Sequence, residues 1–190
     1  MRHRLSITLV LLSTCVLAGC ATTAPPGPAP AGAPAATTVA TGAPPAPVPP
    51  GQLRVTGAVR VPDTWTSDRL ARLPRHTVAV TFGTDRGPES HSETGVPLSA
   101  LLDQAGLLPV PGVKHSELSA GVLVIGADGY RALVSYGEIA PAFGNRDVLL
   151  ATVQDGQQLA RPRLVVPGDV KGGRDVRDVV EVHVINAASG

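Results

Sequence analysis

Short runs of alternating apolar and polar residues dominate the chain from residue 51 onward, and a period of two is typical of half-buried β-strands. The clearest run is Val-Glu-Val-His-Val at 180–184, and another at 76–82 carries Val78 and Val80 on one face. Further apolar runs predict strands at 53–61, 122–125, 131–135, 148–153 and 163–166. The pattern therefore predicts a sheet-rich domain.

One segment follows the helical period instead. Apolar residues at 98, 101, 102, 105 and 108 form a stripe that begins directly after Pro97, a residue suited to the first turn of a helix. Gly106 is a candidate for the C-cap, in which case Leu108 lies past the helix. A shorter helical turn is expected at 66–73, with Thr66 or Ser67 as its cap. Many strands with one substantial helix predict an α+β domain.

Glycine and proline mark the connections between these elements. Asp128-Gly129 predicts a hairpin turn, and Asp155-Gly156 predicts a second turn. Gly57 indicates a bend in the first strand, and Pro162 favours an edge strand. The polar stretch at 83–95 is predicted to be a loop.

Aromatic residues are few, at 3% of the chain. We expect Trp65 and Phe143 to lie in the core. Tyr136 opens a short helix or loop at 136–143, and Tyr130 is expected to pack on the hairpin.

The N-terminal segment differs from the rest of the chain. Arg2, His3 and Arg4 precede an uncharged run at 5–18, which is shorter than the roughly 20 residues of a transmembrane helix and is typical of a signal peptide. The tetrad Leu-Ala-Gly-Cys that ends at Cys20 resembles the lipobox of bacterial lipoproteins, in which the cysteine is lipidated. We predict a lipoprotein signal peptide at 1–19 and a membrane anchor on Cys20.

Residues 21–50 contain ten Ala, ten Pro and no charged residue. Such a segment cannot bury a core, and fully extended it would span on the order of 90 Å at 3.1 Å per residue. We therefore predict a lipidated Cys and a disordered Pro/Ala-rich tether at 20–50, followed by a domain at 51–190. Ala21, where an acidic residue would favour retention in the inner membrane, favours the outer membrane if the cell has two.

Charge and cysteine content exclude several function classes. Sixteen Lys and Arg against fifteen Asp and Glu leave a formal net charge of +1, so the basic excess of a nucleic-acid-binding protein is missing. The two cysteines are Cys15, inside the predicted signal peptide, and Cys20. They exclude both a disulfide framework and a four-cysteine zinc site, and the mature chain is expected to have no free thiol.

The main candidate for ligand binding is the glycine-rich loop after Pro167-Gly168. Backbone N–H groups of such a loop, with Lys and Arg beside them, suit a phosphate or another anion. Its candidate binding residues are Asp169, Lys171, Gly172, Gly173 and Arg174. Arg161 and Arg163 would extend a basic patch. The alternative is a solvated turn between two core strands.

A second candidate is the run Glu89-Ser-His91-Ser-Glu93. If extended, it places one imidazole and two carboxylates on one side, and these groups are metal ligands. An exposed loop seldom preorganises such a site, so we predict no metal.

Five segments, taken in order, resemble the sulfite oxidase type molybdopterin-binding domain: GVPLSALL at 95–102, DGY at 128–130, VLLA and the following DG at 148–156, RLVVPGD at 163–169, and the closing run at 174–184. The resemblance covers most of 53–185. It implies a mixed, β-rich α+β fold of the sulfite oxidase type with a molybdopterin cofactor. It also implies oxidoreductase activity on small oxygenated or sulfur substrates, with the 169–174 loop near the pterin.

The chain departs from that family at the metal. In active members a Cys thiolate ligates molybdenum, from a loop after the strand that corresponds to 76–82. Here Phe-Gly-Thr-Asp stands at 82–85, and no cysteine follows Cys20. Neither Thr nor Asp replaces a soft thiolate. The N-terminus also lacks the Arg-Arg pair of the twin-arginine route, by which folded, cofactor-loaded proteins are exported.

We therefore predict a lipoprotein of the cell envelope, facing the periplasm or the exterior, that displays this domain without cofactor as a binding or interaction module. Its expected partners are the membrane, through the lipid anchor, and an envelope protein. Molybdopterin remains implied by the resemblance. The alternative is a molybdopterin-dependent oxidoreductase that lacks the Cys ligand and binds the cofactor phosphate with the 171–174 loop. A third interpretation is an accessory partner of membrane redox subunits.

Overall fold

A computed structural model describes residues 47–189 of the chain. The predicted signal peptide, Cys20 and most of the tether lie outside the described residues. Between residues 47 and 189, no helix is long and apolar enough to cross a membrane.

The described part of the chain contains nine strands and a few short helices. The strands are β1 (Gln52–Gly57), β2 (Asp63–Thr66), β3 (His76–Thr84), β4 (Gly87–Pro97), β5 (Ala120–Gly126), β6 (Arg131–Ser135), β7 (Leu149–Gln154), β8 (Gln157–Val165) and β9 (Val179–Asn186). The α-helices are α1 (Ser67–Leu70), α2 (Leu98–Ala105) and α3 (Tyr136–Ile139). Single 3₁₀ turns occupy Ser116–Ser119, Gly172–Arg174 and Ala187–Ser189.

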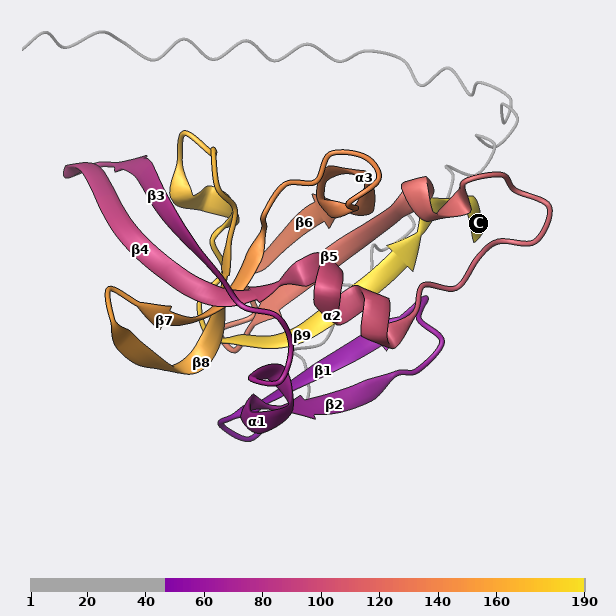
Figure 1. Ribbon diagram of the computed structural model, residues 1–190, viewed down its shortest axis with the longest axis horizontal. Coiled ribbons are helices and arrows are strands. Elements are labelled where there is room, and N and C mark those ends of the chain that lie inside the picture. The colour runs from indigo at the N-terminus through magenta and orange to yellow at the C-terminus, as the bar shows by residue number, and fades with distance from the viewer. Residues whose placement is uncertain (1–46, 190) are drawn as a thin grey trace, which may run out of the picture. The chain divides into compact units, whose positions relative to one another are not determined.

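The strands form two sheets (Figure 1). The first has the order β2-β1-β9-β5-β6, and the second has the order β3-β4-β7-β8. Only β1 and β9 pair in parallel, and all other pairs are antiparallel. The sheet-rich α+β fold predicted from the pattern is therefore confirmed, and β9, the most regular of the predicted runs, lies at the centre of the larger sheet.

The main core lies between the two sheets and α2. Val55 and Val182 come from the first sheet, Leu164 comes from the second, and Leu98 and Leu101 come from α2; each is at most 1% exposed. Four of the five positions of the predicted apolar stripe are buried, and Leu108, which lies past the end of the helix, is exposed. The helix ends at Gly106, the predicted C-cap, whose positive φ of 68° is one that glycine adopts readily.

Turn predictions agree with the structure in detail. The predicted hairpin is formed by β5 and β6, and Gly129 in its turn has a φ of 83°. Thr66 is the cap of α1, since its hydroxyl accepts a hydrogen bond from the Arg69 backbone N–H at 3.3 Å. Pro162 lies in β8, which is an edge strand as expected.

The predicted loop at 83–95 is wrong, because Gly83 and Thr84 are the end of β3 and the residues from Gly87 onward are strand β4. It pairs along its length with β3 through a turn whose two central residues are Asp85 and Arg86. The apolar pattern did not predict this strand because its cross-strand contacts are between hydroxyls, as in the 2.8 Å pair of Thr81 and Ser90. Since β4 pairs with β7 only from Glu93 onward, the outer part of the hairpin, residues 79–92, forms a two-stranded arm (Figure 1).

Three further expectations are corrected. The strand predicted at 163–166 is part of the longer β8, and β2 was not predicted at all. Trp65 is buried as expected, at 2% exposure, but Phe143 is 47% exposed. Phe143 lies outside the core because its loop turns back on itself, with the Phe143 N–H donating to the Ala140 carbonyl.

The first contacts of the domain precede the predicted boundary at Gly51. Val48 is buried, and the Arg161 guanidinium donates to the carbonyl oxygens of Val48 (2.9 Å) and Pro49 (3.3 Å). The last residues assigned to the tether therefore pack against the domain.

Candidate functional site

The predicted ligand loop lies against the outer part of β3. The Gly83 N–H donates to the Val170 carbonyl at 2.8 Å, and Gly83 pairs with Lys171 as an isolated parallel bridge. The Phe82 ring packs on Gly172, because a Cβ added at Gly172 would lie 3.0 Å from the ring. The strand end and the loop are therefore in direct van der Waals contact.

Arg174 joins the two ends of this loop. Its guanidinium donates to both carboxylate oxygens of Asp169, at 2.6 and 2.7 Å, and to Glu138 at 3.2 Å. The hydrogen bonds from Arg174 hold the pKa of Asp169 below its ordinary value, and Asp169 in turn raises the pKa of Arg174. The cation that would bind an anionic ligand is therefore already paired within the protein.

The other predicted residues of the loop are arranged differently. The Gly173 carbonyl accepts a hydrogen bond of 2.6 Å from the Tyr130 hydroxyl, so the tyrosine of the β5–β6 hairpin fastens the loop. Lys171 is exposed, and among the described residues its side chain forms no hydrogen bond or ion pair. Arg161 bonds to the start of the domain and Arg163 faces Glu93, so neither extends a basic patch with Arg174.

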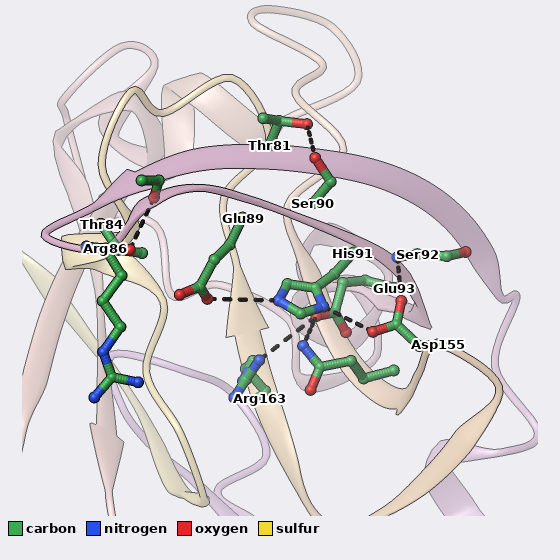
Figure 2. Close-up of polar contacts among 12 residues, drawn as sticks. Thr81, Thr84, Arg86, Glu89, Ser90, His91, Ser92, Glu93, Asp155 and Arg163 are labelled. Atoms are coloured by element: carbon green, nitrogen blue, oxygen red, sulfur yellow. Dashed lines mark hydrogen bonds and ion pairs between the residues drawn. The ribbon is translucent and has the colours of Figure 1, made fainter.

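The polar run on β4 forms the second candidate site. Glu89, His91 and Glu93 lie on one side of the strand, as expected for an extended segment (Figure 2). His91 Nδ1 lies 2.7 Å from a carboxylate oxygen of Asp155, and His91 Nε2 lies 3.8 Å from Glu89. The hydrogen bond with His91 lowers the pKa of Asp155.

Glu93 is the most unusual residue of this site. It is only 1% exposed, and its Oε1 accepts a hydrogen bond from Gln154 at 2.8 Å and lies 3.6 Å from Arg163. Its Oε2 is buried without any hydrogen-bond partner among the described residues. Burial raises the pKa of Glu93, although the Arg163 and His91 charges act in the opposite direction. An orphaned buried oxygen of this kind costs on the order of 1–3 kcal/mol.

These groups do not form a metal site. Glu93 is directed to Gln154 and Arg163 while His91 is directed to Asp155 (Figure 2). Within residues 47–189, no three His, Cys, Asp or Glu side chains come close enough to hold a metal ion. The sequence placed Glu89, His91 and Glu93 on one side correctly, but it missed the partners on β7 and β8.

The buried carboxyl of Glu93 predicts how stability depends on pH. Because its folded-state pKa is raised, its favourable contribution is complete below its ordinary value of 4.5 and is lost as the pH rises through the folded value. In Glu93→Gln the side chain is neutral at every pH. The free energy of unfolding of Glu93→Gln is expected to exceed that of the wild type by about 1 kcal/mol at pH 8, and the difference is expected to shrink below pH 5.

Urea denaturation of both proteins between pH 4 and 8 measures this difference. Glu89→Gln is the matched control, since it removes an exposed carboxylate four positions away on the same side of β4, and no gain in stability is expected. A Glu93→Gln protein that is less stable than the wild type at pH 8 would show that the Arg163 ion pair outweighs burial.

Comparisons with known proteins agree with the fold described above. The family profile described as the oxidoreductase molybdopterin binding domain matches residues 45–190. The fold is similar to the crystal structure of the sulfane dehydrogenase SoxCD from Paracoccus pantotrophus, with a TM-score of 0.57 and 24% identity over 70% of this chain. The match spans only 37% of the SoxCD chain. No curated protein matches the sequence. Because the family profile covers well over half of the 190-residue chain, the chain belongs to the oxidoreductase molybdopterin-binding domain family.

Proposed function

We propose that the chain is a lipid-anchored protein of the cell envelope whose domain keeps the molybdopterin-binding fold without the cofactor and serves as a binding module. The observation that carries the proposal is the β3–β4 turn. The resemblance places the molybdenum-ligating cysteine just after the strand at 76–82. In this chain β3 continues through Gly83 and Thr84 and passes directly into β4.

The donor atoms at this position do not fit molybdenum. Thr84 uses its hydroxyl within the turn, where it donates to the Gly87 carbonyl at 2.8 Å and accepts from the Arg86 N–H at 3.2 Å. Residues 47–189 contain no cysteine. A soft thiolate is the ligand that this metal site requires, and a hydroxyl held in a hairpin turn does not replace it.

The loop geometry supports the same interpretation. Arg174 is bound to Asp169 and Glu138, and the Phe82 ring packs on Gly172. A cofactor phosphate would have to displace the Asp169 carboxylate from Arg174. The loop then has a structural role, because it joins β3, the β5–β6 hairpin and α3. We call it a structural clasp.

Metal analysis of the full-length protein, purified from its native membrane, tests the absence of cofactor. We expect molybdenum well below one atom per chain and no fluorescent pterin after oxidative release. Stoichiometric molybdenum with a pterin would overturn the proposal and would favour a molybdopterin-dependent oxidoreductase without the Cys ligand.

The membrane anchor is tested through the two cysteines, because the lipobox assigns different fates to them. In Cys20→Ser the attachment site is lost, so the protein is expected to leave the detergent phase in Triton X-114 partitioning. Cys15→Ser is the matched control, since residue 15 lies within the predicted signal peptide, and it is expected to partition like the wild type. Equal partitioning of the wild type and Cys20→Ser would refute the anchor.

A further inference from the structure

A cavity of about 370 Å³ lies beside α2, and none of the residues that line it belongs to the 169–174 loop or to the β4 network described above. Its walls come from the start of β3, the first turns of α2, the end of α3 and the segment that leads into β7. This volume is at the lower end of the roughly 300–1,000 Å³ typical of small-molecule sites. Nothing in the proposed function uses it.

The wall formed by residues 140–148 is held by backbone hydrogen bonds, two of them to carbonyls of α3. The N–H groups of Gly144, Asn145 and Arg146 donate to the carbonyls of Gly137, Ala140 and Glu138 at 2.9, 3.1 and 2.8 Å. Asn145 has a φ of 46°, a left-handed conformation that costs energy in a residue other than glycine.

This wall is also joined to the helix, because the Leu98 N–H at the start of α2 donates to the Val148 carbonyl at 2.8 Å. The cavity is thus preformed by fixed backbone, and a ligand would bind it without first ordering a loop.

A histidine at the rim has a defined orientation. His76 Nδ1 lies 2.8 and 2.9 Å from the two carboxylate oxygens of Asp147. A carboxylate accepts hydrogen bonds only, so Nδ1 carries the proton and Nε2 of the neutral ring is an acceptor. Asp147 therefore acts as a positioning residue that leaves one hydrogen-bond acceptor of His76 for a ligand.

The remaining polar groups of the lining supply both donors and acceptors. Among the described residues, the side chains of Ser99, Asp103 and Asn145 form no hydrogen bond or ion pair, although all three line the cavity. Arg146 lies 3.7 Å from Asp169, whose two oxygens are already bound by Arg174, so its donors remain largely available. The Asp103 carboxylate therefore has no ion-pair partner among the described residues, and Arg146 has only the long contact with Asp169.

The balance of these groups selects the class of ligand. An anion would face Asp103 and Asp147, and a cation would face Arg146. A neutral polyol meets both conditions, since each hydroxyl can donate to a carboxylate or to His76 Nε2 and accept from Arg146 or Asn145. The apolar lining of Pro74, Pro97, Pro141, Ala100 and Ile139 suits the C–H faces of a sugar ring. We propose that this cavity binds a neutral polyhydroxylated ligand of about mono- to disaccharide size.

NMR titration of the ¹⁵N-labelled full chain, in a detergent without a sugar headgroup, tests this proposal. D-glucose and N-acetyl-D-glucosamine are the probes, and sodium phosphate and ethylammonium chloride at equal concentration are the charged comparisons. Saturable shifts are expected for the backbone amides of Ser99, Ala100 and Asn145 with at least one sugar, with a dissociation constant of roughly 1–10 mM. Phosphate and ethylammonium are expected to cause no saturable shift there.

Two variants make the assignment specific. Asp103→Ala removes an exposed carboxylate that has no partner in the described protein, so the fold is expected to persist while sugar affinity falls at least fivefold. Asp85→Ala removes an exposed carboxylate from the β3–β4 turn and is expected to leave the affinity unchanged. The proposal fails if neither sugar gives saturable shifts up to 100 mM, if a charged probe binds better than the sugars, or if the two variants behave alike.

Discussion

Replacing Gly57 with Ala is expected to prevent stable folding of the domain. A Cβ at this position would lie 2.0 Å from the Val184 carbonyl oxygen and 2.9 Å from its carbon and nitrogen. These are backbone atoms of β9, the parallel partner of β1, so no side-chain rotation relieves the overlap. Separating the strands would also break the hydrogen bond of 2.8 Å from the Ala58 N–H to the same carbonyl. We expect a loss of about 4 kcal/mol or more, which is a large part of the stability of a small domain.

The chain contains a control with the same backbone strain. Gly57 and Gly129 both have a φ of 83°, but nothing lies within 4 Å of a Cβ added at Gly129. Gly129→Ala is therefore expected to cost only about 1 kcal/mol, from the left-handed conformation alone. Urea denaturation of the two variants, or soluble yield where Gly57→Ala does not fold, separates the steric overlap from the strain. A Gly57→Ala protein as stable as Gly129→Ala would contradict the close approach of β1 and β9.

Replacing Arg174 with Ala is expected to destabilise the domain by about 2–3 kcal/mol, because partly buried charge-assisted hydrogen bonds are removed and the Asp169 carboxylate is left without its partner. Asp169 has a lowered pKa, so its contribution is present above its ordinary value of 3.8 and is lost as the pH falls through the folded value. The difference between the wild type and Arg174→Ala is therefore expected to be largest at neutral pH and to diminish below about pH 4. Thermal and urea unfolding at pH 3 to 7 measure it.

Lys171→Ala is the matched control for this experiment. It removes a cation of the same loop that has no side-chain partner among the described residues, so its effect on stability is expected to stay within about 0.5 kcal/mol. The pair of variants also separates the two interpretations of the loop. A structural clasp predicts that only Arg174→Ala matters. A phosphate-binding loop predicts that both variants lose a bound cofactor while Arg174→Ala has little effect on the stability of the empty protein.

Helices, turns and strands whose apolar period or turn residues lie within one short segment were predicted correctly. The apolar stripe of α2 and the Asp-Gly turn of the β5–β6 hairpin depend on residues within eight positions of one another. The same holds for β9, where the alternation of Val182 and Val184 with polar residues matches the observed burial. Local sequence is sufficient in these cases because period and turn chemistry act over a few residues.

The strands that were not predicted, β4 and β2, lack such a pattern within their own segment. One face of the β3–β4 hairpin carries Thr77, Thr81 and Ser90, whose hydroxyls bond across the hairpin, so β4 lacks the apolar alternation by which strands are recognised. β2 has only Trp65 buried, and its pairing with β1 completes it. Such strands form because a partner strand satisfies their backbone, which is not visible in the strand's own sequence.

Each candidate site brings together residues that are far apart along the chain. Residues 169–174 were chosen correctly as one loop, but the role of Arg174 as a clasp depends on Glu138, 36 positions away. The burial of Glu93 depends on Gln154, 61 positions away, and on Arg163 beyond it. No spacing rule connects residues so far apart. Strand order in the four-stranded sheet sets the contacts of Glu93, and the packing of the loop against α3 sets that of Arg174.

The sequence by itself determined the class of the domain, its one substantial helix, its main turns, and the absence of any cysteine after Cys20. These properties are local or compositional, and each follows from the identity of residues close together in the chain. Only the tertiary structure decided that β3 passes without a loop into β4, that Arg174 is already bound by carboxylates, and that polar groups without partners converge on a cavity beside α2. Those properties are set by which segments the two sheets bring together, and burial and charge pairing take effect only once these segments meet.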